Sequence, residues 1–442
     1  MRIVLYADVG DYHVRFCYGR IFTQCYESDQ SVLKPFGGDP YLMYSEQSEN
    51  SSTDKPIPLF KPHYNINECL REIGECLENG WTGIGYKTTE FESRWKTYTG
   101  FPHAHFVNSA TAGLNLAVET FKRIYGWDRE DEVITTPITF VSTNHAILRN
   151  ELKPVFADID AYLCLQPESV IQKINTKTKA VMFVGMGGSS GNYQEIVNIC
   201  VQHGLKLILD AAHMAGTRVN SKIPGSEADC VIYSFHAVKN LPIADGGMLC
   251  FKDEQCDALS RKLAWLGIDK DTYSRSSSDK MYHWDYHVDY IGHKYNGNSI
   301  AAAMGLVQLK SLDHDNAIRR RIAQWYDKLL EPLSSSVKTI PLPEYCESSR
   351  HLYQILTERR EEFMAYLNSK GISCGVHYKD NTTYPMYRYA ADTCPYASYI
   401  SSHIVTLPMY LDLTYEDIQY ITAQIDRFYR QMIDMTFVSS KI

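Results

Sequence analysis

The stretch DCVIYSFHAVKNLPIADGGMLCF, residues 229–251, holds one lysine, Lys239, between two short apolar runs. The runs Cys230–Tyr233 and Met248–Phe251 have the composition of buried β-strands, and the glycine and proline residues between them predict a loop. A loop lysine that is partly removed from water loses its proton more easily and can attack a carbonyl carbon. Most loop lysines are solvated surface residues, so the rest of the sequence has to decide what Lys239 does.

Two stretches upstream of this loop have features of a ligand site. KLILDAAHMAG, residues 206–216, is an apolar run that ends in Asp210, which predicts a carboxylate at the end of a buried strand, where it needs a partner. NSATAGLNLAVETFKRIY, residues 108–125, predicts a helix whose N-terminal backbone N–H groups suit a phosphate. Each feature has a simpler explanation, because a strand-end aspartate is often a turn residue and Ser-Ala-Thr is often only a helix cap.

The three stretches, in this order, resemble the fold-type I pyridoxal phosphate enzymes and, more closely, the DegT/DnrJ/EryC1/StrS family of sugar aminotransferases. The resemblance extends over about residues 57–428. The pairing of DAAH with SFHAVKNL and a KYN motif is most similar to the branch that makes UDP-4-amino-4-deoxy-L-arabinose. The motifs that carry the resemblance are GWTGIG (80–85), FVNSATAGLNLAV (106–118), DEVITTPITFVST (131–143), LDAAHMAG (209–216), SFHAVKNL (234–241), GHKYNGNSIAAAMGLVQL (292–309) and GVHY (375–378).

The resemblance implies a covalently bound cofactor, pyridoxal 5'-phosphate, and gives roles to residues of these motifs. Lys239 would carry the cofactor and move protons in both half-reactions, while Asp210 would pair with the pyridine nitrogen. His213 would lie near the phenolic oxygen of the cofactor, and Phe140 would stack on its ring. Ala110, Thr111 and Ser234 would bind its phosphate.

The resemblance also implies a homodimer. Lys294, in GHKYNGNS, occupies the position that in the family contacts the cofactor phosphate of the partner subunit. Each active site would then be built from both subunits. Without this role, Lys294 is an exposed surface charge; in the same way, Phe140 is a core phenylalanine at the start of a helix if it does not stack on a cofactor.

Residues expected to bind substrate lie in two places. The polar, aromatic-rich stretch 269–290 contains Tyr282 and Trp284, whose rings suit stacking on a nucleobase or a sugar. His377 and Tyr378 match the family's pair beside the substrate pocket. Three departures from the family pattern lie near the same pocket: Asp245 in place of a glutamate, GMGGSSGN (185–192) in place of a turn that contains histidine, and KDNTTYP (379–385).

The composition argues against several other classes of protein. A formal net charge of −8 disfavours a nucleic acid or an anionic membrane as a partner. The twelve cysteines are scattered, without the spacing typical of metal ligands, so no metal site is expected. No run is long and apolar enough to span a membrane, and residues 1–20 lack the apolar core of a signal peptide, so a cytoplasmic location is expected.

Strand and helix patterns alternate from residue 56 to about residue 315. Such alternation predicts an α/β fold with a mainly parallel sheet that helices cover on both faces, as the fold-type I resemblance also implies. A smaller C-terminal α/β domain is expected to follow, with Cys374–Tyr378 as a short strand. The expected organisation is an N-terminal extension of unknown role (1–55), a large cofactor-binding domain (56–315) and a small domain (316–442).

The expected function is that of a pyridoxal phosphate-dependent aminotransferase. It would move the amino group of L-glutamate onto a keto carbon, expected to be C4, of a nucleotide-linked sugar. Two alternatives stay open. The acceptor could be a C3-ketosugar, a keto-cyclitol or another natural-product carbonyl, or the chain could be a regulatory protein that binds the cofactor without turnover.

Overall fold

The computed structural model describes the strands between residues 5 and 22, residues 56–269, residue 273 and residues 285–439. The chain divides into two compact units, Met1–Thr53 and Asp54–Ile442. In the first unit, three strands form an antiparallel sheet: β1 (Leu5–Val9), β2 (Tyr12–Cys17) and β3 (Arg20–Phe22). The second unit contains all the motifs of the expected ligand site.

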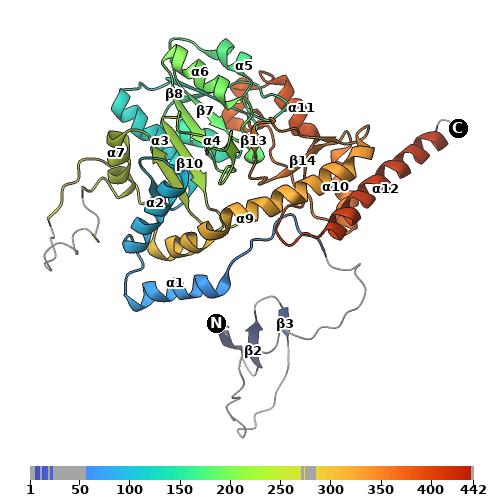
Figure 1. The fold of residues 1–442 in the computed structure, drawn as a ribbon, viewed down its shortest axis with the longest axis horizontal. Coiled ribbons are helices and arrows are strands. Elements are labelled where there is room, and N and C mark those ends of the chain that lie inside the picture. Colours follow the sequence, from blue (N-terminus) through green and yellow to red (C-terminus); the bar gives the residue numbers. More distant parts are fainter. Residues whose placement is uncertain are drawn as a thin grey trace, which may run out of the picture. The chain divides into compact units, whose positions relative to one another are not determined.

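A seven-stranded sheet forms the centre of the second unit (Figure 1). Five neighbouring strands are parallel, and two more extend one edge in antiparallel pairing. This order confirms the mainly parallel sheet expected from the sequence. In spatial order the strands are β4 (His105–Val107), β11 (Gly247–Phe251), β10 (Cys230–Ser234), β8 (Lys206–Asp210), β7 (Thr178–Val184), β5 (Glu132–Thr135) and β6 (Lys153–Phe156).

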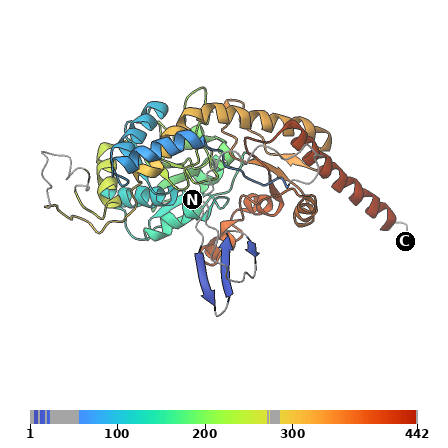
Figure 2. The same ribbon diagram turned by 90° about the horizontal axis from the view of Figure 1, so that it is seen from below.

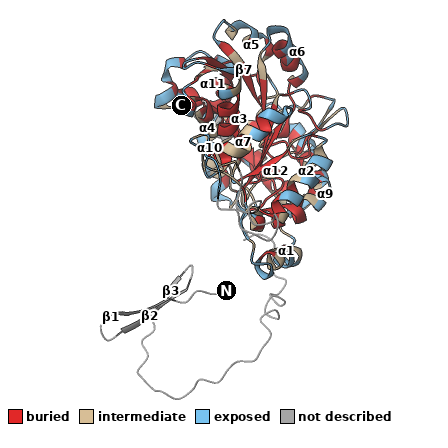
Figure 3. Cartoon of the chain, turned by 90° about the vertical axis from the view of Figure 1, so that its left-hand side faces the viewer, coloured by how far each residue is buried: buried red, intermediate tan, exposed pale blue. Residues whose placement is uncertain are grey.

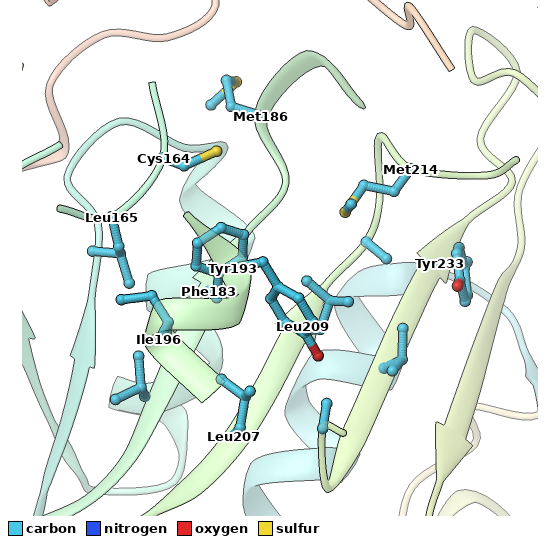
Figure 4. Packing of buried hydrophobic residues seen from close by; sticks show 14 of the residues in the cluster. Cys164, Leu165, Phe183, Met186, Tyr193, Ile196, Leu207, Leu209, Met214 and Tyr233 are labelled. Atoms are coloured by element: carbon cyan, nitrogen blue, oxygen red, sulfur yellow. The ribbon is translucent and has the colours of Figure 1, made fainter. Parts of the chain in front are cut away.

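Helices cover both faces of this sheet because alternate strand residues point to opposite sides. Leu207 and Leu209 belong to the core cluster on one face, which Figure 4 shows together with Tyr193 and Ile196. Ile208 belongs to the cluster on the other face. The first face is covered by α2 (Tyr86–Thr99), α5 (Pro167–Lys173) and α6 (Tyr193–His203), and the second by α3 (Ala110–Tyr125), α4 (Val141–Arg149) and α7 (Glu254–Ala264). Figure 3 shows buried residues concentrated between these layers.

One long helix, α9 (Ser299–Leu330), connects the sheet with the C-terminal part of this unit (Figures 1 and 2). Its 32 residues correspond to a length of about 48 Å. Ala302, Leu306 and Leu312 pack in the core beside the sheet, whereas residues from Ile322 onward pack in the C-terminal core. Neither α9 nor any other helix in the described part of the chain is long and apolar enough to span a membrane.

The C-terminal part is built on a second, antiparallel sheet: β12 (Lys338–Thr339), β14 (Tyr353–Leu356) and β15 (Ile404–Leu407). The predicted strand at Cys374–Tyr378 is wrong, since only Gly375 forms a bridge, to Thr406, and the His377 carbonyl accepts from the Gln354 side chain instead. The remaining elements are α10 (Arg360–Ser369), α11 (Pro395–His403), α12 (Tyr415–Ser439), the pair β13 (Cys346–Glu347) and β9 (Arg218–Val219), and the 3-10 turns η1 (Met186–Gly188), η2 (Glu331–Leu333), η3 (Asn381–Thr383) and η4 (Pro385–Ala390).

Helix α1 (Ile66–Glu78) carries apolar residues on its exposed side. Ile66, Leu70 and Leu77 are 66%, 58% and 61% exposed, whereas Cys69 and Cys76 are buried. The regular spacing of the large apolar residues indicates a helix, and a helix is present. The side of α1 that packs on α9 is nevertheless not the side that carries them.

Candidate functional site

Lys239 lies on the loop between β10 and β11 and borders a cavity. Its backbone N–H donates to the carbonyl of His236 at 2.8 Å, and its Nζ lies 3.4 Å from Nε2 of His351. Burial lowers the pKa of Lys239 to about 8, although the charge of Asp210 acts in the opposite direction. Near that pH half of the amines are uncharged, so Lys239 can serve as a nucleophile or a base.

Asp210 ends β8 with its carboxylate buried. Oδ2 accepts a hydrogen bond from the hydroxyl of Thr143 at 2.8 Å, and Oδ1 accepts from the backbone N–H of Ala212 at 3.1 Å. Burial raises the pKa of Asp210, while the two hydrogen bonds and the charge of Lys239 oppose that rise. Each oxygen of the carboxylate therefore has a donor that favours the anion.

The N-terminus of α3 borders the same cavity. Ser109 caps the helix, because its hydroxyl oxygen accepts from the N–H of Ala112 at 3.1 Å. The N–H groups of Ala110 and Thr111 precede the first bonds of the helix and so remain available to a ligand. Strand β11 runs so close to this turn that a Cβ on Gly247 would lie 2.7 Å from the nitrogen of Ala110.

A hydroxyl at the end of β10 adds a further donor beside this turn. Ser234 lines the cavity, and its oxygen accepts from the N–H of His236 at 3.4 Å. Its own hydroxyl proton is therefore free to be donated into the cavity. Together, the helix N-terminus and the Ser234 hydroxyl form a site suited to an anion.

His213 and Tyr378 form one wall of the cavity. Nδ1 of His213 accepts from the N–H of Gly187 at 3.2 Å, so the ring proton lies on Nε2, which donates to the Tyr378 hydroxyl at 3.2 Å. Burial, followed by the charge of Lys239, lowers the pKa of His213 well below its usual value, so the ring is neutral. Phe140, which precedes α4 and is 56% exposed, has its ring centroid 6.0 Å from that of Tyr378.

His377 lies beside Tyr378, and its Nδ1 is 2.9 Å from the hydroxyl of Thr406. Burial and the nearby charge of Lys239 lower the pKa of His377 to about 4. At neutral pH the cavity therefore presents neutral imidazoles from both His213 and His377. Within the described ranges, no three His, Cys, Asp or Glu side chains are grouped as a metal site requires.

The cavity has a volume of about 320 Å³. It brings together side chains from the large sheet, from α3 and from the C-terminal part of the chain. The predicted site residues that line it are Lys239, Asp210, His213, Ser234, Ala110, Thr111, Phe140, His377 and Tyr378.

Of the remaining predicted residues, the structure describes only Lys294, which is not among the residues that line this cavity. The amine of Lys294 lies 3.0 Å from the centroid of the Trp265 ring, and the backbone carbonyl of Lys294 accepts from the side chain of Asn108 at 3.2 Å. Lys294 thus lies beside the start of α3 without lining its own chain's cavity. Tyr282 and Trp284 lie outside the described residues.

Thr143, His351 and Asn240 contribute to the site although they are not among the predicted site residues. Thr143 follows Phe140 by three residues, a spacing that places both side chains on one face of a helical turn, so this contact has a sequence signal. His351 has none, because it is a single histidine in a different part of the chain. Its contact with Lys239 connects residues that are 112 positions apart.

The three departures from the family pattern are located around the cavity. Gly187, in GMGGSSGN, donates its N–H to His213 at 3.2 Å. Asn381, in KDNTTYP, is buried and donates from its side chain to the carbonyl of Thr139 at 2.9 Å, which fixes this segment to the turn before α4. Asp245 lines the cavity in an exposed position.

The model of the DegT/DnrJ/EryC1/StrS aminotransferase family matches residues 64–426. The spore coat polysaccharide biosynthesis protein SpsC of Bacillus subtilis is 33% identical over 363 residues, which are 79% of this chain and 92% of that protein.

Solved structures of two aminotransferases have a similar fold. The Helicobacter pylori aminotransferase PseC, involved in the biosynthesis of pseudoaminic acid, has a TM-score of 0.78 and 27% identity over 85% of this chain and all of that chain. The putative sugar aminotransferase Spr1654 of Streptococcus pneumoniae, in its PLP-form, has a TM-score of 0.75 and 27% identity over 83% of this chain and 97% of that chain.

Proposed function

We propose, from the premise that the chain belongs to the DegT/DnrJ/EryC1/StrS aminotransferase family, that it transfers the amino group of L-glutamate to C4 of a nucleotide-linked ketosugar. As a member of this family, the protein is a pyridoxal phosphate-dependent aminotransferase. The names of SpsC and PseC connect those relatives with polysaccharide and pseudoaminic acid biosynthesis, which supports a sugar as the acceptor. The observation that carries the proposal is the meeting of Lys239, Asp210 and the α3 N-terminus at one cavity.

The residues at this cavity fit pyridoxal phosphate by their chemistry. An amine of lowered pKa suits the aldehyde, and a buried carboxylate suits a protonated ring nitrogen. The N-terminus of α3, with the Ser234 hydroxyl, suits the phosphate, and the close approach at Gly247 leaves this turn without a covering side chain. When bound, pyridoxal phosphate supplies a carbonyl that takes up the amino group and a ring that withdraws electrons from the reacting carbon.

Lys239 is the residue we assign to proton transfer. With a pKa of about 8, its amine is partly uncharged near neutral pH and can take a proton from a carbon held in the cavity. The same group can return the proton to another atom, which allows it to act as base and then as acid. Asp210 favours positive charge at its side of the cavity because both of its oxygens are hydrogen-bonded as an anion.

The wall of aromatic and imidazole side chains orients the reactants. His213 offers its Nε2–H together with the Tyr378 hydroxyl, a pair of neutral groups suited to an oxygen of the cofactor or the sugar. Phe140 has an exposed ring face at the cavity and is the residue we assign to stacking on the cofactor. His377 and Tyr378 are assigned to the substrate side, and Tyr282 and Trp284 remain candidates for the nucleotide.

We further propose that a homodimer completes each site. The exposed apolar residues of α1, with Val288 and Ile291 at 59% and 92% exposure, are typical of a surface that another subunit covers. Lys294 belongs to the segment that follows Ile291, and in the dimer we assign its amine to the phosphate of the partner subunit.

The test is a two-step transamination with the purified holoprotein. L-glutamate alone is expected to change the absorption of the bound cofactor and to release one equivalent of 2-oxoglutarate per subunit. A nucleoside diphosphate-linked 4-ketosugar should then take up the amino group, whereas the matched 3-ketosugar and a keto-cyclitol should not.

The alternatives predict different results in the same experiment. Transfer to the 3-ketosugar or the cyclitol, but not to the 4-ketosugar, would replace the C4 assignment. A cofactor spectrum that responds to no amino donor, including L-glutamine and L-alanine, would indicate a regulatory protein without turnover.

A further inference from the structure

A chain of hydrogen bonds leads from helix α9 to the amine of Lys239. Asn316, on α9, donates from Nδ2 to the carbonyl of Ala215 at 2.9 Å, so its Oδ1 is the atom that faces Asn240. Nδ2 of Asn240 donates to that oxygen and to the carbonyl of Ser349, at 2.7 Å each. Because carbonyl oxygens only accept, the orientation of both side-chain amides is determined.

The fixed amide of Asn240 determines the proton position on His351. The Oδ1 atom of Asn240 lies 3.0 Å from Nδ1 of His351, so Nδ1 must carry the proton and donate it. Burial lowers the pKa of His351 well below its usual value, so the ring holds no second proton. Its Nε2 consequently presents a lone pair, and that atom lies 3.4 Å from Nζ of Lys239.

His351 and His213 therefore have opposite ring protonation, although their centroids are only 4.5 Å apart. His213 carries its proton on Nε2 and donates it to Tyr378, whereas His351 carries its proton on Nδ1. If Nε2 of His351 carried the proton, it would donate to the lone pair of the lysine amine and make that amine a poorer base.

We infer that His351 is a positioning residue for Lys239. Asn240 fixes the tautomer of His351, and Nε2 of His351 then accepts a hydrogen bond from the amine of Lys239. The lone pair of that amine is left free to accept a proton. This inference rests on the proposed role of Lys239. It adds a requirement, since the orientation of the lysine then depends on two residues that do not line the main cavity.

The test measures the pKa of Lys239 in the full-length protein after removal of the cofactor. Competitive labelling with acetic anhydride across pH, read by mass spectrometry of the tryptic peptides, gives the pKa of each lysine. A neutral hydrogen-bond acceptor stabilises the protonated amine more than the uncharged amine. His351→Asn removes the acceptor Nε2, so the pKa of Lys239 should fall by about one unit. Asn240→Ala should lower it as well, because the imidazole can then donate from Nε2.

His351→Gln is the matched variant, because its Oε1 can occupy the place of Nε2. It should restore the pKa of Lys239 to the wild-type value. A pKa in His351→Asn equal to that of wild type, or an equal fall in His351→Gln and His351→Asn, would overturn the inference.

The measurement separates this inference from the proposed function because it needs neither cofactor nor substrate. Asp210, His213 and His377 face the amine, and Arg319 and Asp315 line the small cavity at its other flank; all five stay unchanged in the variants. Lys206, paired with Asp229 at 2.9 Å, is the internal control and should keep its reactivity in every variant that folds.

Discussion

Lys87, at the corner of α1 and α2, and Lys239, at the cavity, are two lysines whose surroundings give them opposite properties. The side chain of Lys87 is 6% exposed and binds Glu72 and Glu75 at 2.5 and 2.7 Å. Burial alone would lower the pKa of Lys87, but the two carboxylates outweigh it and raise the pKa. Among the described residues, the amine of Lys239 has the neutral His351 as its one hydrogen-bond partner, and burial lowers the pKa of Lys239 to about 8.

The difference shows that removal from water does not by itself make a lysine reactive. Removal from water favours the uncharged amine, and a bonded carboxylate reverses this preference. Lys87 is therefore a structural cation and Lys239 an available base.

The largest expected effect is on catalysis. Lys239→Met should reduce the release of 2-oxoglutarate from L-glutamate by about 10³-fold, because the acid and base of both half-reactions is lost. Lys87→Met, matched in its new side chain, should leave the rate per folded molecule unchanged. Single-turnover kinetics with the holoprotein measures both rates. Comparable losses of rate in the two variants would contradict the different roles given to the two lysines.

For stability, we expect the opposite order, with a larger effect from Lys87→Met than from Lys239→Met. Lys87→Met removes the charge-assisted hydrogen bonds to Glu72 and Glu75 and leaves Glu72 with Arg71 at 3.1 Å, so it should lower the free energy of unfolding by about 3 kcal/mol. Lys239→Met removes an amine whose charged form is disfavoured by burial, so near pH 7 it should leave stability unchanged or higher. Urea unfolding at one fixed protein concentration compares the variants. A larger loss in Lys239→Met would mean that the cavity lysine is a structural cation.

The two lysines should also respond oppositely to pH. The unfolded chain binds more protons at Lys239 than the folded protein does between pH 8 and 10.5, so Lys239 adds stability as the pH rises through that window. Relative to Lys239→Met, wild type should gain about 2 kcal/mol between pH 8 and pH 10. Lys87 has a raised pKa, so its contribution is present below pH 10.5 and falls above it. Cofactor-free protein unfolded at several pH values provides the comparison; parallel curves for wild type and Lys239→Met would contradict it.

The smallest expected effect is on the binding of pyridoxal phosphate by Asp210. Thr143→Val removes the donor on Oδ2 of Asp210, which raises the pKa of that carboxylate further and weakens its hold on a protonated ring nitrogen. The dissociation constant of pyridoxal phosphate should rise about tenfold. Thr143→Ser keeps the hydroxyl and should bind as wild type does. Equal binding by the valine variant would show that the carboxylate needs no such support.

Local patterns in the sequence indicated one half of the cavity, and the family resemblance supplied the residues predicted in the other half. Asp210, Lys239 and the α3 turn lie at the ends of strands and helices whose apolar patterns are clear, so local spacing indicates their place. The parallel sheet follows from the same patterns. His377 and Tyr378, from the C-terminal region, also line the cavity as predicted, but only the resemblance indicated them, because contacts between distant residues leave no periodic signal.

His351 illustrates this limit most clearly. Its neighbours in sequence do not distinguish it from a histidine buried in the core, and its role becomes visible only where Asn240 and Lys239 reach it. The wrong strand at Cys374–Tyr378 has a related cause, since the side chain of Gln354, which is distant in sequence, binds the His377 carbonyl that a strand neighbour would have bound. On α1, the regular spacing of the apolar residues indicates a helix but not which side of it faces the protein.

Helix α9 bears on the construction of hybrid enzymes from two family members. Asn316 ties the helix to Ala215 and Asn240, whereas Tyr326, farther along, donates to the carbonyl of Pro408 at 3.0 Å. A splice before the helix would separate Asn316 from its partners, and a splice after it would separate Tyr326 from its own. The junction that preserves both of these contacts lies inside the helix, between Asn316 and Tyr326. The contacts of His213 with Tyr378 and of Lys239 with His351 would then join residues from the two parents, so these pairs must match in any hybrid.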